Sequence, residues 1–227
     1  MPKKETLTEL YSTQFMANAL VAIGGFIDAY TFVQRGGGVM AAGQTGNIIF
    51  LSVNVVNRDF LGVKTKLATM LAFALGCFIG QIIKEVHKTH YWRIPPTLIL
   101  EILVFFTVGW LPTSLPNVAI VPALAFVMAM QTTTFNEIEG QGYNNVFSTG
   151  NLKKSMVGLA SYLFTKNRKQ LKSGLTFLGL VLSFAIGAMI SAVMQNYFGL
   201  ATIWWACGFL ALLTIGYMIA IYRLGAE

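Results

Sequence analysis

Apolar residues gather into long runs along this chain, and short polar stretches separate the runs. A helix needs about 20 apolar residues to cross the hydrocarbon core of a bilayer, with about 17 to 25 as the working range. Runs near this length cover 14–34, 66–86, 97–112, 117–136, 173–195 and 200–222. Two further runs, 45–57 and 149–164, are shorter or more polar. The pattern predicts an all-α integral membrane protein with about eight helical segments.

The two weaker runs begin in the same way. The first opens with Gln44, Thr45, Gly46 and Asn47, and a glycine-bearing stretch that breaks helices precedes it. The second opens with Ser148, Thr149, Gly150 and Asn151, and again follows such a stretch. A shared triplet at two helix breaks indicates an internal repeat.

Further matches extend the repeat in both directions. Upstream, Thr31-Phe32 matches Thr134-Phe135, which places Asp28 opposite Gln131 in the preceding helix. Downstream, the Phe-Ala-Leu-Gly sequence at 73–76 matches the Phe-Ala-Ile-Gly sequence at 184–187. We therefore expect one membrane domain over 1–227, made of two tandem four-segment repeats at approximately 14–112 and 117–223. The second segment of each half is short or broken.

The number of crossings decides how the halves are related. If all eight segments cross, the repeats are parallel, and if the weak segments re-enter, each half has three crossings and the halves are inverted. Basic clusters favour the cytoplasm. Eight crossings with both termini cytoplasmic place most of these clusters inside, but they leave the basic loop at 84–93 outside. We expect eight crossings, with six or seven as the alternative.

Composition agrees with a membrane protein. Hydrophobic residues make up 55% of the chain and charged residues 11%, whereas a soluble domain carries about a quarter charged residues. The formal charge of +7 is distributed in short clusters between apolar runs, so it indicates membrane topology and no nucleic-acid partner. Cys77 and Cys207 lie in apolar runs without the spacing of metal ligands. We expect no metal and no cofactor.

The candidate site combines the two helix breaks with the intramembrane polar residues beside them. A helix that begins inside the membrane directs unpaired N–H groups and a partial positive charge at what precedes it. Asp28 is the clearest ionisable residue in an apolar run, which normally faces a protein interior or a water cavity. Glu101 is expected only to mark the entrance of its helix. The predicted substrate-binding residues are Asp28, Thr31, Gln44, Thr45, Gly46, Asn47, Gln131, Thr134, Thr149, Gly150 and Asn151.

Four ordered motifs resemble a known family. They are Gly-Gly-Phe-Ile-Asp-Ala-Tyr-Thr-Phe at 24–32, Gln-Thr-Gly-Asn at 44–47, Met-Ala-Met-Gln at 128–131 and Thr-Gly-Asn-Leu at 149–152. Together they are similar to the recurrent motifs of the YoaK-like family of bacterial membrane proteins, over nearly the whole chain. The resemblance implies a multi-pass protein of the bacterial plasma membrane with a domain of unknown function. It implies no substrate, catalytic residue or cofactor.

Two functions from different classes fit these features. The first is a secondary transporter or channel for a small polar or anionic solute, with both helix breaks around one cavity and Asp28 as acceptor of a coupling proton. The second is a non-catalytic membrane scaffold or accessory subunit in which the triplets only cap and pack helices. The chain contains no visible nucleophile and base pair, so we do not expect an enzyme. The lipid bilayer is the expected surrounding, and the oligomeric state stays open.

Overall fold

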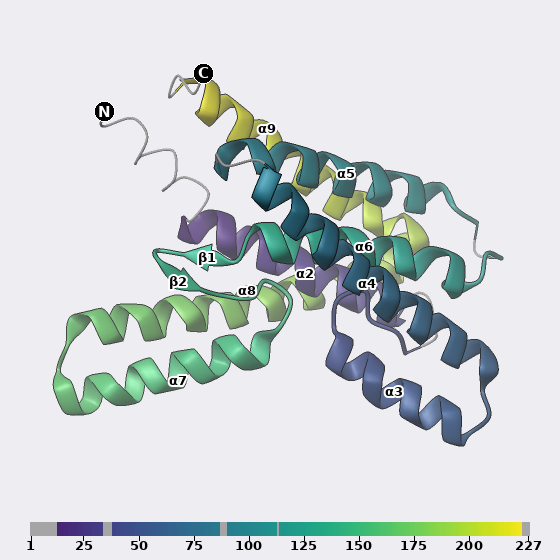
Figure 1. The fold of residues 1–227 in the computed structure, drawn as a ribbon, viewed down its shortest axis with the longest axis horizontal. Helices are drawn as coiled ribbons and strands as arrows, with labels where there is room; N and C mark the ends of the chain where they lie inside the picture. Colours follow the sequence, from purple (N-terminus) through teal and green to yellow (C-terminus); the bar gives the residue numbers. More distant parts are fainter. Residues whose placement is uncertain (1–12, 34–37, 87–89, 113, 224–227) are drawn as a thin grey trace.

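The computed structural model describes residues 13–33, 38–86, 90–112 and 114–223, and most of this chain is helical (Figure 1). In chain order the elements are α2 (Gln14–Val33), α3 (Gln44–Val56), α4 (Phe60–Val86), α5 (His90–Trp110), α6 (Asn117–Thr134), β1 (Glu137–Ile138), β2 (Gln141–Gly142), α7 (Ser148–Thr165), α8 (Arg168–Phe198), the 3-10 turn η1 (Gly199–Thr202) and α9 (Ile203–Arg223). The all-α prediction is confirmed. Each expected segment has a helix, and α4, α5 and α8 begin several residues earlier than expected.

A small antiparallel hairpin between α6 and α7 was not predicted. It pairs Glu137 with Gly142 and Ile138 with Gln141. Its turn residues Glu139 and Gly140 have φ of 47° and 75°, and positive φ at both positions is what the type I′ turn of a two-residue hairpin requires. The hairpin therefore forms within the stretch that the sequence marks only as a helix breaker.

Several helices are long and apolar enough to cross a membrane. They are α2, α4, α6 and the run from Arg168 to Arg223 that contains α8 and α9. α3 and the 96–110 part of α5 are apolar but shorter. Large apolar side chains such as Leu71, Phe78 and Leu212 are exposed on these helices, which is the arrangement that a lipid surrounding requires. The chain is a membrane protein.

The contacts between helices fix their relative directions. α2 and α8 run in parallel, because Gln14 bonds Thr176 near one end and Gln195 bonds the Ala29 carbonyl near the other. α4 and α6 also run in parallel, because Gly76 lies against Phe126 and Lys84 against Thr133. Each of these two pairs joins a helix of the first half of the chain to a helix of the second half.

The remaining pairs are antiparallel. α5 opposes α9, since Cys207 Sγ bonds the carbonyl of Ile102 while Trp204 bonds that of Phe106. α5 also opposes α6, since Thr97 meets Thr134 while Glu101 lies against Gln131. α2 opposes α9 as well, because one cavity is lined by residues 16 and 217 and another by residues 26 and 206. α3 opposes α4, and α7 opposes α8, the helix that follows each across a short turn (Figure 1). Helices α2 to α5 therefore run forward, forward, back and forward, and α6 to α9 run back, back, forward and back.

The helices form two three-helix sets with the α5–α9 pair beside them. We use "first bundle" for α2, α7 and α8, in which α8 packs on both α2 and α7, and "second bundle" for α3, α4 and α6, in which α4 packs on both α3 and α6. The connection from α2 to α3 crosses between the bundles in one direction, and the connection from α6 to α7 crosses back. Both helix breaks thus lie between the two bundles.

Two matched glycines allow close helix approaches. A Cβ on Gly187 of α8 would collide with the main-chain carbonyl of Ala22 in α2. A Cβ on Gly76 of α4 would collide with that of Phe126 in α6. These glycines close the two matched Phe-Ala-x-Gly sequences, so the same motif makes the tight contact in each bundle.

Candidate functional site

The first helix break is held by two side chains of α2. Asp28 is 6% exposed, and its Oδ1 accepts hydrogen bonds from the N–H groups of Ala42 at 2.7 Å and Gly43 at 3.3 Å. Thr31 is fully buried, and its hydroxyl accepts the N–H of Ala41 at 3.1 Å. Asp28 and Thr31 thereby satisfy three consecutive N–H groups of the loop before α3, so these three are not free to bind an anionic solute.

Asn47, the last residue of the first triplet, clasps the same loop. Its Nδ2 donates to the carbonyl of Met40 at 2.7 Å, and its Oδ1 accepts the N–H of Met40 at 2.9 Å. The Asn47 Nδ2 also donates to Gln44 Oε1, and Gln44 Nε2 donates to the carbonyl of Ala41. Asn47 is fully buried, so its amide is a structural link between the loop and the first turn of α3.

Asn151 repeats this clasp at the second break. Its Nδ2 donates to the carbonyl of Asn144 at 2.7 Å, and its Oδ1 accepts the N–H of Asn144 at 3.5 Å. The side chain of Asn144 in turn accepts the N–H groups of Val146 and Phe147. Both triplets therefore use their asparagine to hold the main chain seven residues upstream.

The other triplet residues do not converge on one site. Thr45, Thr149 and Gly150 are exposed, and Gly46 is half-buried beside Met40. No described contact joins Asp28 to Gln131, the pair that the repeat aligns. The structure brings Asp28, Thr31, Gln44 and Asn47 together at the first break, and it places Gln131 and Thr134 in a second cluster.

That second cluster is built around Glu101, a residue expected only to mark a helix entrance. The expectation was wrong, because Glu101 lies in the middle of α5 and is fully buried. With the Gln131 amide oriented to satisfy both of its ends, its nitrogen donates to the two Glu101 oxygens at 2.7 and 2.9 Å. Its oxygen accepts from Asn145 Nδ2 at 2.9 Å. Thr97 and Thr134 meet at 3.4 Å one helical turn away.

Asn145 connects this cluster to the second helix break. It is fully buried, its Oδ1 has no partner, and it follows the clasped residue Asn144 in the loop before α7. A Cβ on Gly24 of α2 would lie 2.6 Å from the Asn145 carbonyl, so glycine is needed for this loop to reach α2. The sequence offered one signal for the cluster, since Glu101 is the only acid in its apolar run. Nothing in the pattern pointed to Asn145.

Two apolar cavities lie elsewhere, on the side where α2 faces α9. One of about 430 Å³ is lined by α2 and α9, and one of about 280 Å³ is lined by α2, α8 and α9. Phe209 lines both. None of the predicted site residues lines either cavity, and their apolar walls suit hydrocarbon better than a polar solute.

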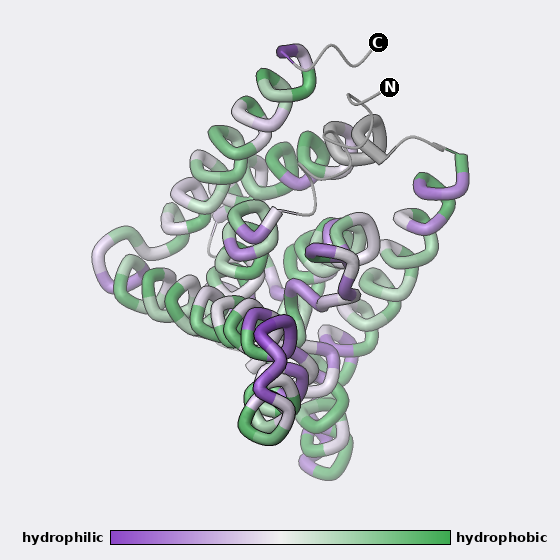
Figure 2. The backbone as a smooth tube through the Cα atoms, turned by 90° about the vertical axis from the view of Figure 1, so that its left-hand side faces the viewer, coloured by the Kyte–Doolittle hydropathy of each residue, from purple (hydrophilic) through white to green (hydrophobic). Residues whose placement is uncertain are grey.

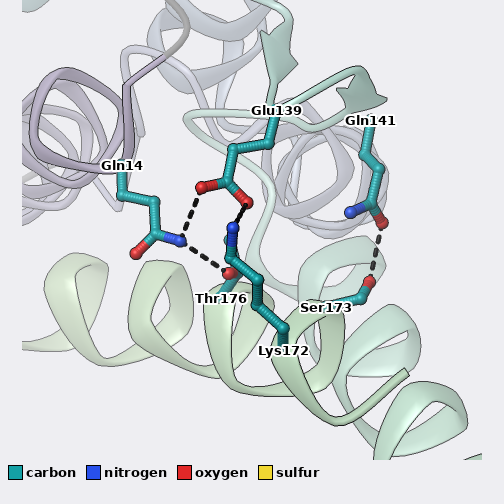
Figure 3. A network of polar contacts seen from close by, with 6 residues as sticks. All are labelled: Gln14, Glu139, Gln141, Lys172, Ser173 and Thr176. Carbon is teal, nitrogen blue, oxygen red and sulfur yellow. Dashed lines mark hydrogen bonds and ion pairs between the residues drawn. The ribbon is translucent and has the colours of Figure 1, made fainter. Parts of the chain in front are cut away.

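A polar network ties the hairpin to α2 and α8 at one end of the molecule (Figure 3). Gln14 donates to Glu139 at 3.0 Å and to Thr176 at 3.1 Å, and Lys172 pairs with Glu139 at 2.9 Å. On the other strand, Ser173 donates to Gln141 at 2.7 Å. The hairpin follows α6 of the second bundle, so these bonds connect the two bundles at this end.

Comparison with known proteins gives a family and no activity. No curated protein and no solved structure matches the chain. The model of one family, described as a protein of unknown function (DUF1275), matches residues 16–216 and so covers both helix breaks and the Glu101 cluster. The YoaK-like resemblance of the sequence motifs agrees with this match, and the chain belongs to the DUF1275 family.

Proposed function

We propose that this chain is a secondary transporter for a small polar solute, built from two inverted four-segment repeats at approximately 14–112 and 117–223. The observation that carries the proposal is the reversal of helix directions between the halves. Inverted repeats whose interrupted helices meet at the repeat interface are typical of transporters, where alternating access uses the same elements in opposite orientations.

The repeats in this proposal have six full crossings, by α2, α4, α5, α6, α8 and α9. Successive full crossings must alternate in direction, whereas α2 and α3 run the same way, as do α6 and α7. α3 has 13 residues and is about 20 Å long at 1.5 Å per residue, which is shorter than a hydrocarbon core of about 30 Å. The proposal therefore takes the six-crossing alternative. In it, α3 and α7 do not cross the membrane but re-enter it from opposite sides.

The charge distribution supports this topology. Three helices each contribute a lysine that bonds a group in or beside the hairpin. These residues are Lys84, Lys154 and Lys172. The hydrophilic turn between α7 and α8 faces the viewer at this same end in Figure 2. On the positive-inside rule, the proposal assigns the hairpin end to the cytoplasm. The basic loop that misfits eight crossings then lies inside, together with Gln14 and Arg223 at the ends of the described helices.

The chemistry of the breaks narrows the class of solute. The buried ionisable groups beside them are the carboxyls of Asp28 and Glu101, and Asp28 and Thr31 already occupy the N–H groups before α3. These features favour a neutral or cationic polar solute over an anion. In this mechanism the two bundles rock against each other and expose the breaks alternately to each side.

One set of observations favours the scaffold alternative. Asn47 and Asn151 are 0% and 2% exposed and bond only to nearby chain, as packing devices do. The proposal assigns this arrangement to a closed state, in which the bundles meet and the hairpin network is intact. A scaffold would have no second state, so the two functions differ in whether the bundles move.

A reversible cross-link tests the proposal. Purified protein in liposomes is screened for uptake of labelled amino acids, polyamines and sugars, with Cys77 and Cys207 replaced by alanine. Gln14→Cys and Glu139→Cys are then joined by a short cleavable thiol reagent, which fixes α2 to the hairpin. We expect uptake to stop on cross-linking and to return on cleavage, while each single-cysteine variant stays active with the reagent. Uptake that continues in the cross-linked protein, or no uptake of any class, would contradict the proposal.

A further inference from the structure

The carboxyl of Glu101 has different hydrogen-bond partners from the carboxyl of Asp28 at the first helix break. Asp28 accepts two main-chain N–H groups at the end of α2, so it acts as a cap for the loop. Glu101 has only the side-chain amide of Gln131, and the structure gives it no ion pair among the residues that it describes. An ionised carboxyl in this position would be uncompensated inside the membrane.

Among the side chains that the structure describes, none near Glu101 supplies a countercharge. α6, which contacts it directly, carries no charged side chain, and neither does η1. The basic residue of α9 is Arg223 at its exposed end. On α4, Lys84 bonds the Thr133 carbonyl and Asn136 at the hairpin end, and Lys64 and Lys66 lie near the opposite end. The other titratable groups on neighbouring helices are Asp28 and Tyr30 of α2, Lys153, Lys154 and Tyr162 of α7, Cys77 and Glu85 of α4, and Cys207, Tyr217 and Tyr222 of α9.

A second, independent observation marks this place as a binding site. Asn145 is fully buried, and the amide that reaches Gln131 has an oxygen without a partner. Buried polar atoms are nearly always hydrogen-bonded, so such an oxygen, joined through Gln131 to a buried carboxyl, points to an exchangeable guest that brings a proton or positive charge. A neutral carboxylic acid has an O–H to donate, and an ionised one does not.

We infer that Glu101, Gln131 and Asn145 form a proton-binding site, with Glu101 as the group that takes the proton from water on one side and releases it to the other. The inference rests on the proposed transporter and names its coupling ion. The sequence suggests Asp28 as the acceptor of the coupling proton. The inference assigns this role to Glu101 on α5 instead. Asn145 links protonation to the second break, because its main chain lies between the clasped Asn144 and the close contact with Gly24.

Infrared difference spectroscopy of the full chain in bilayers tests the site without a solute. A protonated carboxyl buried in protein gives a carbonyl stretching band that shifts when hydrogen is exchanged for deuterium. We expect this band at neutral pH in the wild type, its loss in Glu101→Gln, and its persistence at a shifted frequency in Glu101→Asp. Glu137→Gln, which changes an exposed carboxyl on β1, is the matched control and keeps the band.

Three results would overturn the site. The first is the absence of the band in a folded wild-type protein. The second is loss of the band in Asp28→Asn with retention in Glu101→Gln, which would assign the proton to Asp28. The third is loss of the band when sodium chloride replaces choline chloride at constant pH, which would make this a sodium site. The wild type supplies the first and third results, so neither depends on a variant that folds.

The coupling role is measured separately in the liposomes used for uptake. A pH gradient is expected to drive accumulation of the transported solute in the wild type and in Glu137→Gln, and not in Glu101→Gln. Accumulation that still follows the pH gradient in Glu101→Gln contradicts the inference and leaves the transporter intact. If the infrared band of Glu101 is present in a protein that transports none of the tested solutes, the proposed transporter function is contradicted. The proton-binding site is then retained.

Discussion

The side-chain amide of Asn47 forms two hydrogen bonds with the main chain of Met40, one to its carbonyl at 2.7 Å and one from its N–H at 2.9 Å. Asn151 forms the corresponding pair with Asn144, although its N–H contact is longer at 3.5 Å. An asparagine can do this because its amide carries a donor and an acceptor side by side. The clasp fixes where each helix restarts after the break.

Removal of the first clasp is expected to destabilise the protein. Asn47→Ala leaves both main-chain groups of Met40 without these partners, at a cost of about 2 kcal/mol. Asn151→Ala is expected to cost less, because one of its two bonds is already long. Thermal unfolding in detergent measures both, with the exposed neighbours Thr45→Ala and Thr149→Ala as controls that change stability by less than about 0.5 kcal/mol. Equal stability of Asn47→Ala and Thr45→Ala would show that the clasp contributes nothing.

Asp28 should tolerate loss of its charge better than loss of its oxygen. Asp28→Asn keeps an acceptor for the N–H groups of Ala42 and Gly43, whereas Asp28→Ala leaves both buried without it. We expect Asp28→Ala to cost about 2 to 3 kcal/mol and Asp28→Asn at least about 1 kcal/mol less. Unfolding midpoints of the two variants, measured in the same detergent, give the comparison. If Asp28→Asn destabilised the protein as much as Asp28→Ala, the charge of Asp28 would be what stabilises the fold, and its hydrogen bonds to Ala42 and Gly43 would not be.

Glycine substitutions separate tight helix contacts from open ones. Gly187→Ala and Gly76→Ala place a methyl group against a main-chain carbonyl, which cannot move aside as a side chain can, and each is expected to cost about 1 to 3 kcal/mol. Gly208 and Gly216 of α9 have nothing within 4 Å of an added Cβ. Alanine there should be neutral or stabilise the helix by up to about 1 kcal/mol. Similar unfolding temperatures for all four variants would contradict the packing of α2 on α8 and α4 on α6.

Cysteine labelling from one side of the membrane separates six crossings from eight. Asn57 is an exposed position in the turn after α3, and Lys169 is an exposed position in the first turn of α8, next to the turn after α7. Eight crossings place both turns in the cytoplasm, whereas the six-crossing topology places them on opposite sides. In a background without the two native cysteines, a membrane-impermeant thiol reagent added to intact cells should label Asn57→Cys and not Lys169→Cys. Opening the cells should make both react, which confirms that both thiols are reachable. Equal protection of both positions in intact cells would restore eight crossings.

Local pattern predicted the helices well because each one follows from a run of apolar residues of sufficient length. It also located both breaks, since glycine-bearing stretches before Thr-Gly-Asn cannot continue a helix. The pattern could not give their direction. α3 and α7 resemble weak crossings in sequence, and only their packing on α4 and α8 fixes which way each runs. The assignment of loop charge to one side depends on that direction.

Which candidate residues lie near one another could be predicted in part, for the same reason. Asp28, Thr31, Gln44 and Asn47 are close in sequence on either side of one short loop, so their proximity follows from the chain itself. Glu101, Gln131 and Asn145 come from two helices and a loop, and an isolated acid in an apolar run carries no sign of its partner.

By itself, the sequence determined that the chain is helical, belongs in a membrane and is interrupted twice by matched motifs, because apolar length, low charge and glycine act locally. The tertiary structure decided that the two halves run in opposite directions. It decided as well that each of the two bundles contains helices from both halves. It also decided that Glu101 is buried against Gln131 at the second break. These properties depend on which surfaces meet, and the shape of packed side chains and main-chain carbonyls determines that only when all the helices are present.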